Sequence, residues 1–251
     1  MFTRLLVGLD GSRAADVALD QAIDLGHRFR ATLVLAHVRE RGTVGTEAGA
    51  LLERADARAD AAGVAHESIE RPGDPDVVLA ELARDADGVL VGRRGRVTAG
   101  DALGPTVASL VRIAERCVIV CGSQVSPMRV CAVAFDGREA SKRALDLAVR
   151  FAGITGSTVH VIHANDDPQE GLRIVGVAEA ALSLGGVAFA THVESGPPGE
   201  VVAQVIRRTG CDALFAGAHV YRELPGRPSP VVVSHAEQIL IHTDLPVVVQ
   251  P

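Results

Sequence analysis

Short apolar runs alternate along this chain with longer segments whose apolar residues recur at helical spacing. The first run, Arg4–Leu9, is followed by Asp10-Gly11-Ser12, which predicts a buried strand, a turn and a helix N-cap at Asp10 or Ser12. One face of the next segment carries Ala14, Ala18, Leu19, Ala22 and Gly26, as an amphipathic helix would. The same reasoning predicts strands at Thr32–Val38, Val64–Glu70, Gly88–Val91 and Cys117–Cys121, and helices at Glu47–Ala62, Asp76–Arg84 and Thr106–Glu115.

The pattern starts again in the second half of the chain. Val130–Phe135 reads as a strand followed by Asp136, which lies 136 − 10 = 126 positions after Asp10. The same offset relates Gly11 to Gly137, Ala18 to Ala144, Leu19 to Leu145, Ala22 to Ala148 and His37 to His163. A period this long indicates a duplicated domain rather than a solenoid, with domains at residues 1–124 and 128–251.

Alternation of strands and helices in each half predicts an α/β fold with a parallel sheet and helices on both faces. Ligands of such sheets bind outside the carboxyl ends of the strands, near the point where the strand order reverses. Asp10, Val38 and Gly92 all fall at strand ends, so we expect them to meet in one crevice.

A glycine loop follows the fourth predicted strand. It runs from Gly92-Arg93-Arg94-Gly95 to Gly104-Pro105-Thr106, where a helix is expected to begin. Backbone N–H groups of such a loop can point at an anion, and the helix start adds the positive end of its dipole. Pro105 offers no N–H. A phosphate loop and a purely structural turn both fit this pattern.

Composition narrows the range of functions. The formal net charge of −6 disfavours a partner that is bound by phosphate neutralisation, so no nucleic acid is expected. The four cysteines contain no Cys-x-x-Cys pair, which speaks against a zinc site and favours reduced core cysteines. The chain opens without a signal-peptide pattern and has no apolar run of membrane-spanning length, so no membrane association and a cytoplasmic location are expected.

These motifs, in this order and present twice, resemble the universal stress protein family. The resemblance rests on the strand and Asp-Gly that open each half, on Ala36-His37-Val38 and Ile162-His163-Ala164 at the ends of the second strands, and on Gly-x-x-Gly in the first half. It implies two tandem Rossmann-like domains, each a five-stranded sheet. It also implies an intrachain pseudo-dimer in which Cys117–Cys121 and Pro246–Gln250 lie near the internal pseudo-two-fold axis.

Members of the family that bind ATP carry Gly-x2-Gly-x9-Gly-Ser/Thr, and the first half matches this pattern in part. Gly92 and Gly95 fit, but Gly104 follows after eight residues, and Pro105 stands where Ser or Thr is expected, which leaves Thr106 as a displaced hydroxyl. By resemblance, Asp10 contacts the adenine region and Val38 packs by the base. The implied nucleotide-binding set is Asp10, Gly11, Val38, Gly92, Arg94, Gly95, Gly104 and Thr106.

The second half departs further from the pattern. Gly217 remains, but Val220 stands where Gly95 stood, and the following loop, residues 221–230, is longer and rich in proline. Val233-Ser234 falls at the Gly-Ser position. A second site would therefore consist of Asp136, Gly217 and Ser234, with two glycines lost.

Each of these residues also has an ordinary structural explanation. Asp10 and Asp136 fit helix caps, Arg93, Arg94 and Arg96 fit a solvated loop, and His37 and His163 fit structural roles better than ligand contacts. No catalytic residues are expected, because the chain lacks a Walker lysine and its sole lysine, Lys142, falls on a predicted helix.

The sequence thus predicts a non-enzymatic stress-response protein that binds ATP or a related adenine nucleotide, with Mg²⁺, mainly in its first domain and in a regulatory role. The alternative is a nucleotide-free module that acts through a protein partner. Slow ATP hydrolysis and a further homodimer are left open.

Overall fold

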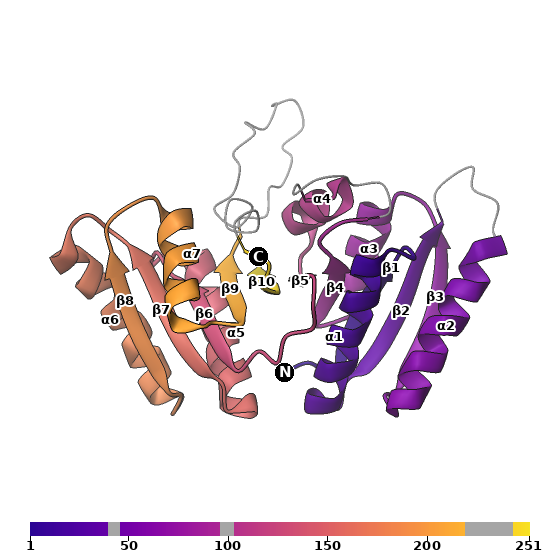
Figure 1. The fold of residues 1–251 in the computed structure, drawn as a ribbon, viewed down its shortest axis with the longest axis horizontal. Coiled ribbons are helices and arrows are strands. Elements are labelled where there is room, and N and C mark those ends of the chain that lie inside the picture. The colour runs from indigo at the N-terminus through magenta and orange to yellow at the C-terminus, as the bar shows by residue number, and fades with distance from the viewer. Residues whose placement is uncertain (40–45, 96–102, 219–242) are drawn as a thin grey trace. The chain divides into compact units, whose positions relative to one another are not determined.

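The structure is a computed structural model that describes residues 1–39, 46–95, 103–218 and 243–251 (Figure 1). The chain divides into two compact units, Met1–Val125 and Ser126–Pro251. Each unit is a parallel sheet with helices on its faces, so the α/β fold class predicted from the sequence is confirmed. The intrachain pseudo-dimer stays a prediction.

In the first unit, the described residues form five parallel strands in the order β3-β2-β1-β4-β5. The strands are β1 (Arg4–Leu9), β2 (Thr32–Arg39), β3 (His66–Pro72), β4 (Gly88–Gly92) and β5 (Cys117–Cys121). The helices are α1 (Arg13–Phe29), α2 (Thr46–Ala62), α3 (Pro75–Ala83) and α4 (Pro105–Ile113). The strand order reverses between β1 and β4, where Val7 pairs with Leu90.

The second unit repeats this plan, with the order β8-β7-β6-β9-β10. Its strands are β6 (Val130–Ala134), β7 (Thr158–Ala164), β8 (Phe189–Glu194), β9 (Ala213–Gly217) and β10 (Val247–Gln250). The helices described are α5 (Glu139–Thr155), α6 (Pro168–Leu184) and α7 (Pro198–Thr209). Here β6 and β9 flank the reversal, as β1 and β4 do in the first unit.

The first helix of each unit shows how the repeat is built locally. Of the face predicted for α1, Ala18, Leu19, Ala22 and Gly26 are buried, whereas Ala14 is only partly buried. The helix ends at Arg30, which adopts a left-handed conformation with φ 54° and donates its N–H to Gly26 O. The matching residue after α5 is Gly156, with φ 73°. Glycine suits this conformation and arginine does not.

A carboxylate secures the start of the first strand in both units. Asp87 Oδ2 accepts hydrogen bonds from Thr3 N at 2.6 Å and Arg4 N at 3.0 Å. Asp212 likewise accepts from Arg129 N at 3.0 Å and Val130 N at 2.9 Å. The sequence reasoning missed these two residues, although they lie 212 − 87 = 125 positions apart and so belong to the repeat.

The cores are aliphatic, with few aromatic side chains. In the second unit Phe151 of α5 packs against Phe215 of β9, with ring centroids 5.6 Å apart. All four cysteines are buried and free, as predicted. Burial raises the pKa of Cys117 and Cys121 to about 12, so neither thiol is reactive at neutral pH. Among the described residues, no helix has the length and apolarity needed to cross a bilayer.

Candidate functional site

Two of the predicted segments, Asp10-Gly11 and Gly92–Gly95, leave the sheet at the point of strand reversal in the first unit. The chain leaves β1 through Asp10 and Gly11 into α1, and it leaves β4 through Arg93 toward α4. Because β1 and β4 are parallel neighbours, both exits lie at the same edge of the sheet. This is the edge at which open α/β sheets bind their ligands.

Asp10 and Ser12 have different roles in the turn after β1. Ser12 is the N-cap of α1, and its hydroxyl accepts a hydrogen bond from Ala15 N at 3.1 Å. Asp10 Oδ1 accepts a hydrogen bond from Ser12 N at 2.9 Å and so shapes the turn. Gly11 between them has φ 77°, a conformation that favours glycine. Of the two cap candidates, Ser12 is therefore the cap.

Two contacts join this turn to the glycine loop. The Ser12 hydroxyl donates to Arg94 O at 3.5 Å. A Cβ placed on Gly95 would lie 3.0 Å from Asp10 Oδ2. The Asp10 carboxylate and the Gly95 backbone thus face each other across the reversal, at a distance that a side chain on Gly95 would crowd.

Position 92 needs a glycine for a packing reason that does not depend on any ligand. A Cβ at Gly92 would lie 2.5 Å from the Ala14 carbonyl carbon, so only glycine lets α1 approach β4 this closely. Gly217 stands in the same relation to the Ala140 backbone in the second unit. Gly92 was predicted as part of the nucleotide pattern, but the packing of α1 against β4 already requires a glycine there.

The start of α4 offers fewer donors than a complete phosphate loop. Gly104, buried at the N-cap position, donates its N–H to Arg93 O at 3.0 Å, which closes the base of the loop. Pro105 occupies N1, where proline is well tolerated but contributes no N–H. The first turn therefore offers an anion the N–H groups of Thr106 and Val107, together with the Thr106 hydroxyl.

The end of β2 lies beside this edge. Val38 is only 9% exposed, and its neighbour His37 places Nδ1 2.8 Å from Leu9 O, at the end of β1. In the second unit His163 Nδ1 lies 2.7 Å from Phe135 O in the equivalent place. The two histidines hold adjacent strand ends together, which supports the structural explanation of their recurrence.

The arginines of the loop differ in exposure. Arg93 is 7% exposed, and Arg94 is half-buried, so neither is a freely solvated loop residue. The positive charge of Arg93 acts to lower the pKa of Cys121, although burial of that thiol dominates and raises it. Arg96 lies outside the described residues. Among the residues that are described, no group of His, Cys, Asp and Glu is arranged to hold a metal ion.

The second unit uses its strand-end aspartate differently. Asp136 Oδ1 accepts from Arg138 N at 2.9 Å, as Asp10 accepts from Ser12, but it also accepts from the Ser141 hydroxyl at 2.6 Å. Position 15 of the first unit, which matches Ser141, is an alanine and has no hydroxyl. Ser234, Val220 and the loop at 221–230 lie outside the described residues.

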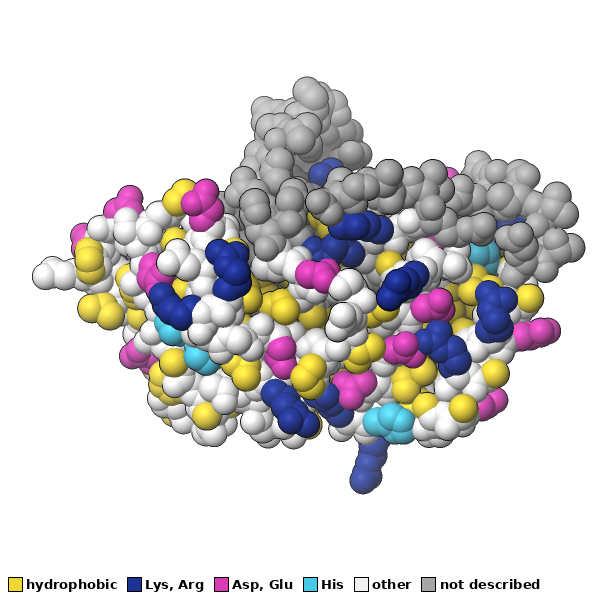
Figure 2. All heavy atoms as spheres, viewed as in Figure 1, with side chains coloured by type: hydrophobic (Ala, Val, Ile, Leu, Met, Phe, Trp, Pro, Cys, Tyr) yellow, Lys and Arg dark blue, Asp and Glu magenta, His cyan; other side chains and the backbone are white. Residues whose placement is uncertain are grey.

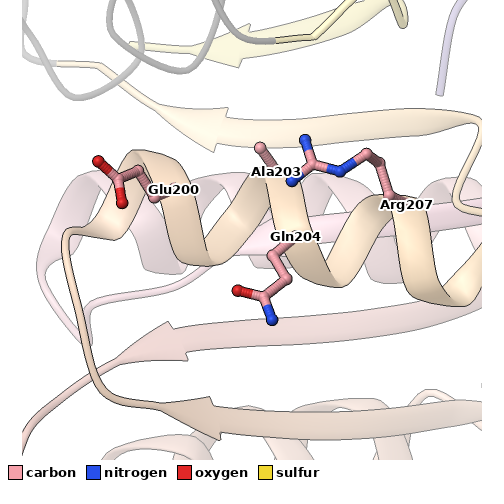
Figure 3. A pocket seen from close by; sticks show the side chains of 4 residues that line it. All are labelled: Glu200, Ala203, Gln204 and Arg207. Atoms are coloured by element: carbon pink, nitrogen blue, oxygen red, sulfur yellow. The ribbon is translucent and has the colours of Figure 1, made fainter.

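A depression of the second unit is lined by Glu200, Ala203, Gln204 and Arg207 (Figure 3). All four come from α7, and their side chains point in different directions around that one helix. The depression includes no strand end and no glycine loop, so it is not the nucleotide site expected from the sequence. On the surface visible in Figure 2, basic and acidic side chains are interspersed rather than gathered into a basic patch.

The fold defines a duplicated α/β protein, in which each unit carries a parallel sheet whose strand order reverses once. The family model described as the universal stress protein family matches residues 1–122 and 169–251. The chain belongs to the universal stress protein family, as the resemblance indicated.

Solved structures share this fold over nearly the whole chain. A universal stress protein from Archaeoglobus fulgidus is 20% identical, with a TM-score of 0.83, and the match covers 98% of this chain and 97% of that one. A protein from Pseudomonas aeruginosa, described as a putative universal stress protein, is 18% identical, with a TM-score of 0.75 and coverage of 99% and 93%. A universal stress protein in complex with cAMP is 31% identical over 49% of this chain and 98% of that one, with a TM-score of 0.43. No curated protein matches the sequence.

Proposed function

We propose that this stress protein binds an adenine nucleotide, ATP with Mg²⁺, in its first domain, and that the bound nucleotide regulates the protein rather than reacting. One observation carries the proposal: Asp10 and Gly95 face each other at the strand reversal, within contact distance of any side chain that replaced Gly95. With the Asp10 carboxylate next to the Gly95 backbone, a nucleotide could place a polar edge of its base or sugar on one side and a phosphate on the other.

The surrounding groups extend this assignment. Val38 supplies an apolar surface for the base, and Thr106 and Val107 supply N–H groups at the positive end of the α4 dipole. Arg94 supplies positive charge next to Gly95. Mg²⁺ would enter with the phosphates, since it is usually bound through substrate phosphates rather than by a cage of protein ligands.

The second domain is the weaker candidate, because Asp136 already accepts the Ser141 hydroxyl. A ligand that needed this carboxylate would have to displace the Ser141 hydroxyl, and the residue that matches Ser141 in the first domain is Ala15. We therefore expect one nucleotide per chain. A regulatory role is favoured because Lys142, the sole lysine, lies on α5, where it is paired with Glu139 at 2.9 Å.

A nucleotide-free interaction module is the second candidate, and one observation favours it. The Gly104 N–H is already donated to Arg93 O, and Pro105 has none, so the α4 start lacks two of the donors that a phosphate could use.

Calorimetry with ATP and Mg²⁺ separates the two candidates. Saturable binding supports the proposal, and it should strengthen in Pro105→Ser, which restores an N–H and a hydroxyl. Absence of saturable binding in both proteins would support the interaction module.

A further inference from the structure

Strand β8 is the least buried strand of the second unit. All of its residues, Phe189–Glu194, are only partly buried, whereas β6, β7 and β9 each have a run of buried residues. It lies at the end of the strand order, with β7 as its one neighbour among the described strands (Figure 1). An edge strand that buries little apolar surface can open locally while the rest of its domain stays folded.

A pair of histidines connects β8 to β7. His160 Nδ1 of β7 lies 2.9 Å from His192 Nε2 of β8, and the two rings are parallel to within 8°. At this distance one nitrogen donates its N–H and the other accepts it. In the strand register His192 lies beside Ile162, two residues after His160, so the pair crosses diagonally from one strand to the other.

This hydrogen bond limits the number of protons that the pair can hold. A neutral imidazole has one N–H, so two neutral rings can share one between the facing nitrogens. A first added proton can go to the outer nitrogen of the donor ring, which keeps the bond and makes it charge-assisted. A second added proton gives every nitrogen an N–H, so two N–H groups and two positive charges would face each other. The doubly protonated pair therefore cannot keep this geometry.

The charged groups around the pair do not remove this conflict. Glu194 lies on the same face of β8 as His192, but it is paired with Arg208 of α7. Glu179 of α6 lies on the opposite face, where it accepts the Thr191 hydroxyl at 2.8 Å. Burial lowers the pKa of both histidines, which agrees with a folded pair that resists protons.

The repeat shows that the fold does not need these histidines. Strand register places Val34 and Ile69 of the first unit at the positions of His160 and His192. Both residues favour strands and neither takes up a proton. The proton-sensitive connection is therefore a feature of the second unit alone.

We infer that the pair formed by His160 and His192 is an acid-sensitive device, which releases the edge strand β8 from β7 while the rest of the second unit stays folded. Once β8 is released, both rings are in water and take up protons near the ordinary histidine pKa of about 6.5. The closed strand thus binds fewer protons than the released one. Closure is most stable above this pH and weakens as the pH falls below it. The inference does not rest on nucleotide binding.

Hydrogen–deuterium exchange with mass spectrometry tests the release at about pH 7.5 and about pH 5.5, on either side of the ordinary histidine pKa. Rates are corrected for the intrinsic pH dependence of exchange. Protection of the β8 amides should fall at least about tenfold at the lower pH, because two protons favour the released strand, while β9 keeps its protection. His160→Val/His192→Ile, which installs the first-unit residues, should lose less than about threefold.

A single-histidine variant supplies the matched control. His27 is exposed on α1 of the first unit, so His27→Gln removes one histidine without touching the pair, and its β8 should behave as in the wild type. Protection of β9 at the higher pH checks that each variant is folded. The inference is overturned if the protection of β8 does not depend on pH, or if the double variant loses as much as the wild type. Equal losses in β8 and β9 would also overturn it, because the whole unit would then be unfolding.

Discussion

Asp10 and Gly95 lie 85 positions apart in the chain, yet a Cβ on Gly95 would stand 3.0 Å from Asp10 Oδ2. A side chain at position 95 would crowd the carboxylate, which would have to move aside. This relationship joins the two parts of the proposed nucleotide site, the turn after β1 and the loop after β4.

Gly95→Ala should therefore weaken nucleotide binding. The added methyl pushes the carboxylate out of place, and we expect an affinity loss of about tenfold, equal to about 1.4 kcal/mol. Stability should change little, because the flexible Asp10 side chain can move and the backbone of Gly95 is not in the left-handed region. Calorimetry with ATP and Mg²⁺ measures the effect. Gly153→Ala is the control, since Gly153 faces open space on α5.

Gly92→Ala should act on stability instead. Its Cβ would lie 2.5 Å from the Ala14 carbonyl carbon, and backbone atoms cannot give way as a side-chain end can. We expect a loss of about 3 kcal/mol, at the upper end for overpacked sites. Gly217→Ala should cost a similar amount through Ala140. Urea unfolding gives the free energies, and losses below about 1 kcal/mol in both variants would contradict the packing role.

Arg30→Gly should stabilise the protein. Arg30 holds φ 54° at the end of α1, whereas the second unit uses Gly156 at the matching position. Glycine relieves the strain of the left-handed conformation, but it also gives the unfolded chain more conformational freedom. The net gain in the free energy of unfolding should be about 1 kcal/mol. The reciprocal change Gly156→Arg should destabilise the chain. If thermal unfolding shows Arg30→Gly to be neutral or destabilising, the side chain of Arg30 makes a contribution that offsets the strain.

His160 and His192 should make the second unit sensitive to acid. The rings stack with centroids 5.2 Å apart, and Nδ1 of His160 lies 2.9 Å from Nε2 of His192. Burial lowers the pKa of both, and the charges of His160 and Arg208 lower the pKa of His192 further, against an opposing effect of Glu194. The unfolded chain then binds more protons than the folded one. Stability is therefore full above the ordinary histidine pKa of 6.5 and falls as the pH drops below it.

The first unit suggests the variant that tests this. Strand register places Val34 and Ile69 where the second unit has His160 and His192. His160→Val/His192→Ile should therefore lose less stability than the wild type between about pH 8 and about pH 5. Urea unfolding at the two pH values measures the difference. An equal loss in both proteins would assign the acid sensitivity to other groups.

Most of the fold could be predicted from the sequence, because hydrophobic spacing and the repeat each predict the same helices and strands. Ala18 and Ala144 at matching positions already implied a buried helix face in each half, and both are fully buried. Asp87 and Asp212 were missed because a carboxylate before a strand has no local pattern, and only the 125-residue offset could have revealed it.

The site was less predictable for physical reasons. Gly92 and Gly95 look equivalent in the sequence, but a Cβ on Gly92 would meet the backbone of α1, whereas a Cβ on Gly95 would meet the end of the Asp10 side chain. The hydrogen bond from Ser141 to Asp136 depends on the helix start bringing the two together. No spacing rule distinguished Asp136 from Asp10 beforehand.

Native mass spectrometry with ATP and Mg²⁺ tests the central claim most directly, because it counts nucleotides on each chain. The structure leads us to predict one nucleotide per chain, with Asp10→Ala losing it and Asp136→Ala retaining it. A chain that binds none, that binds two, or that loses its nucleotide in Asp136→Ala but not in Asp10→Ala would contradict a site in the first domain.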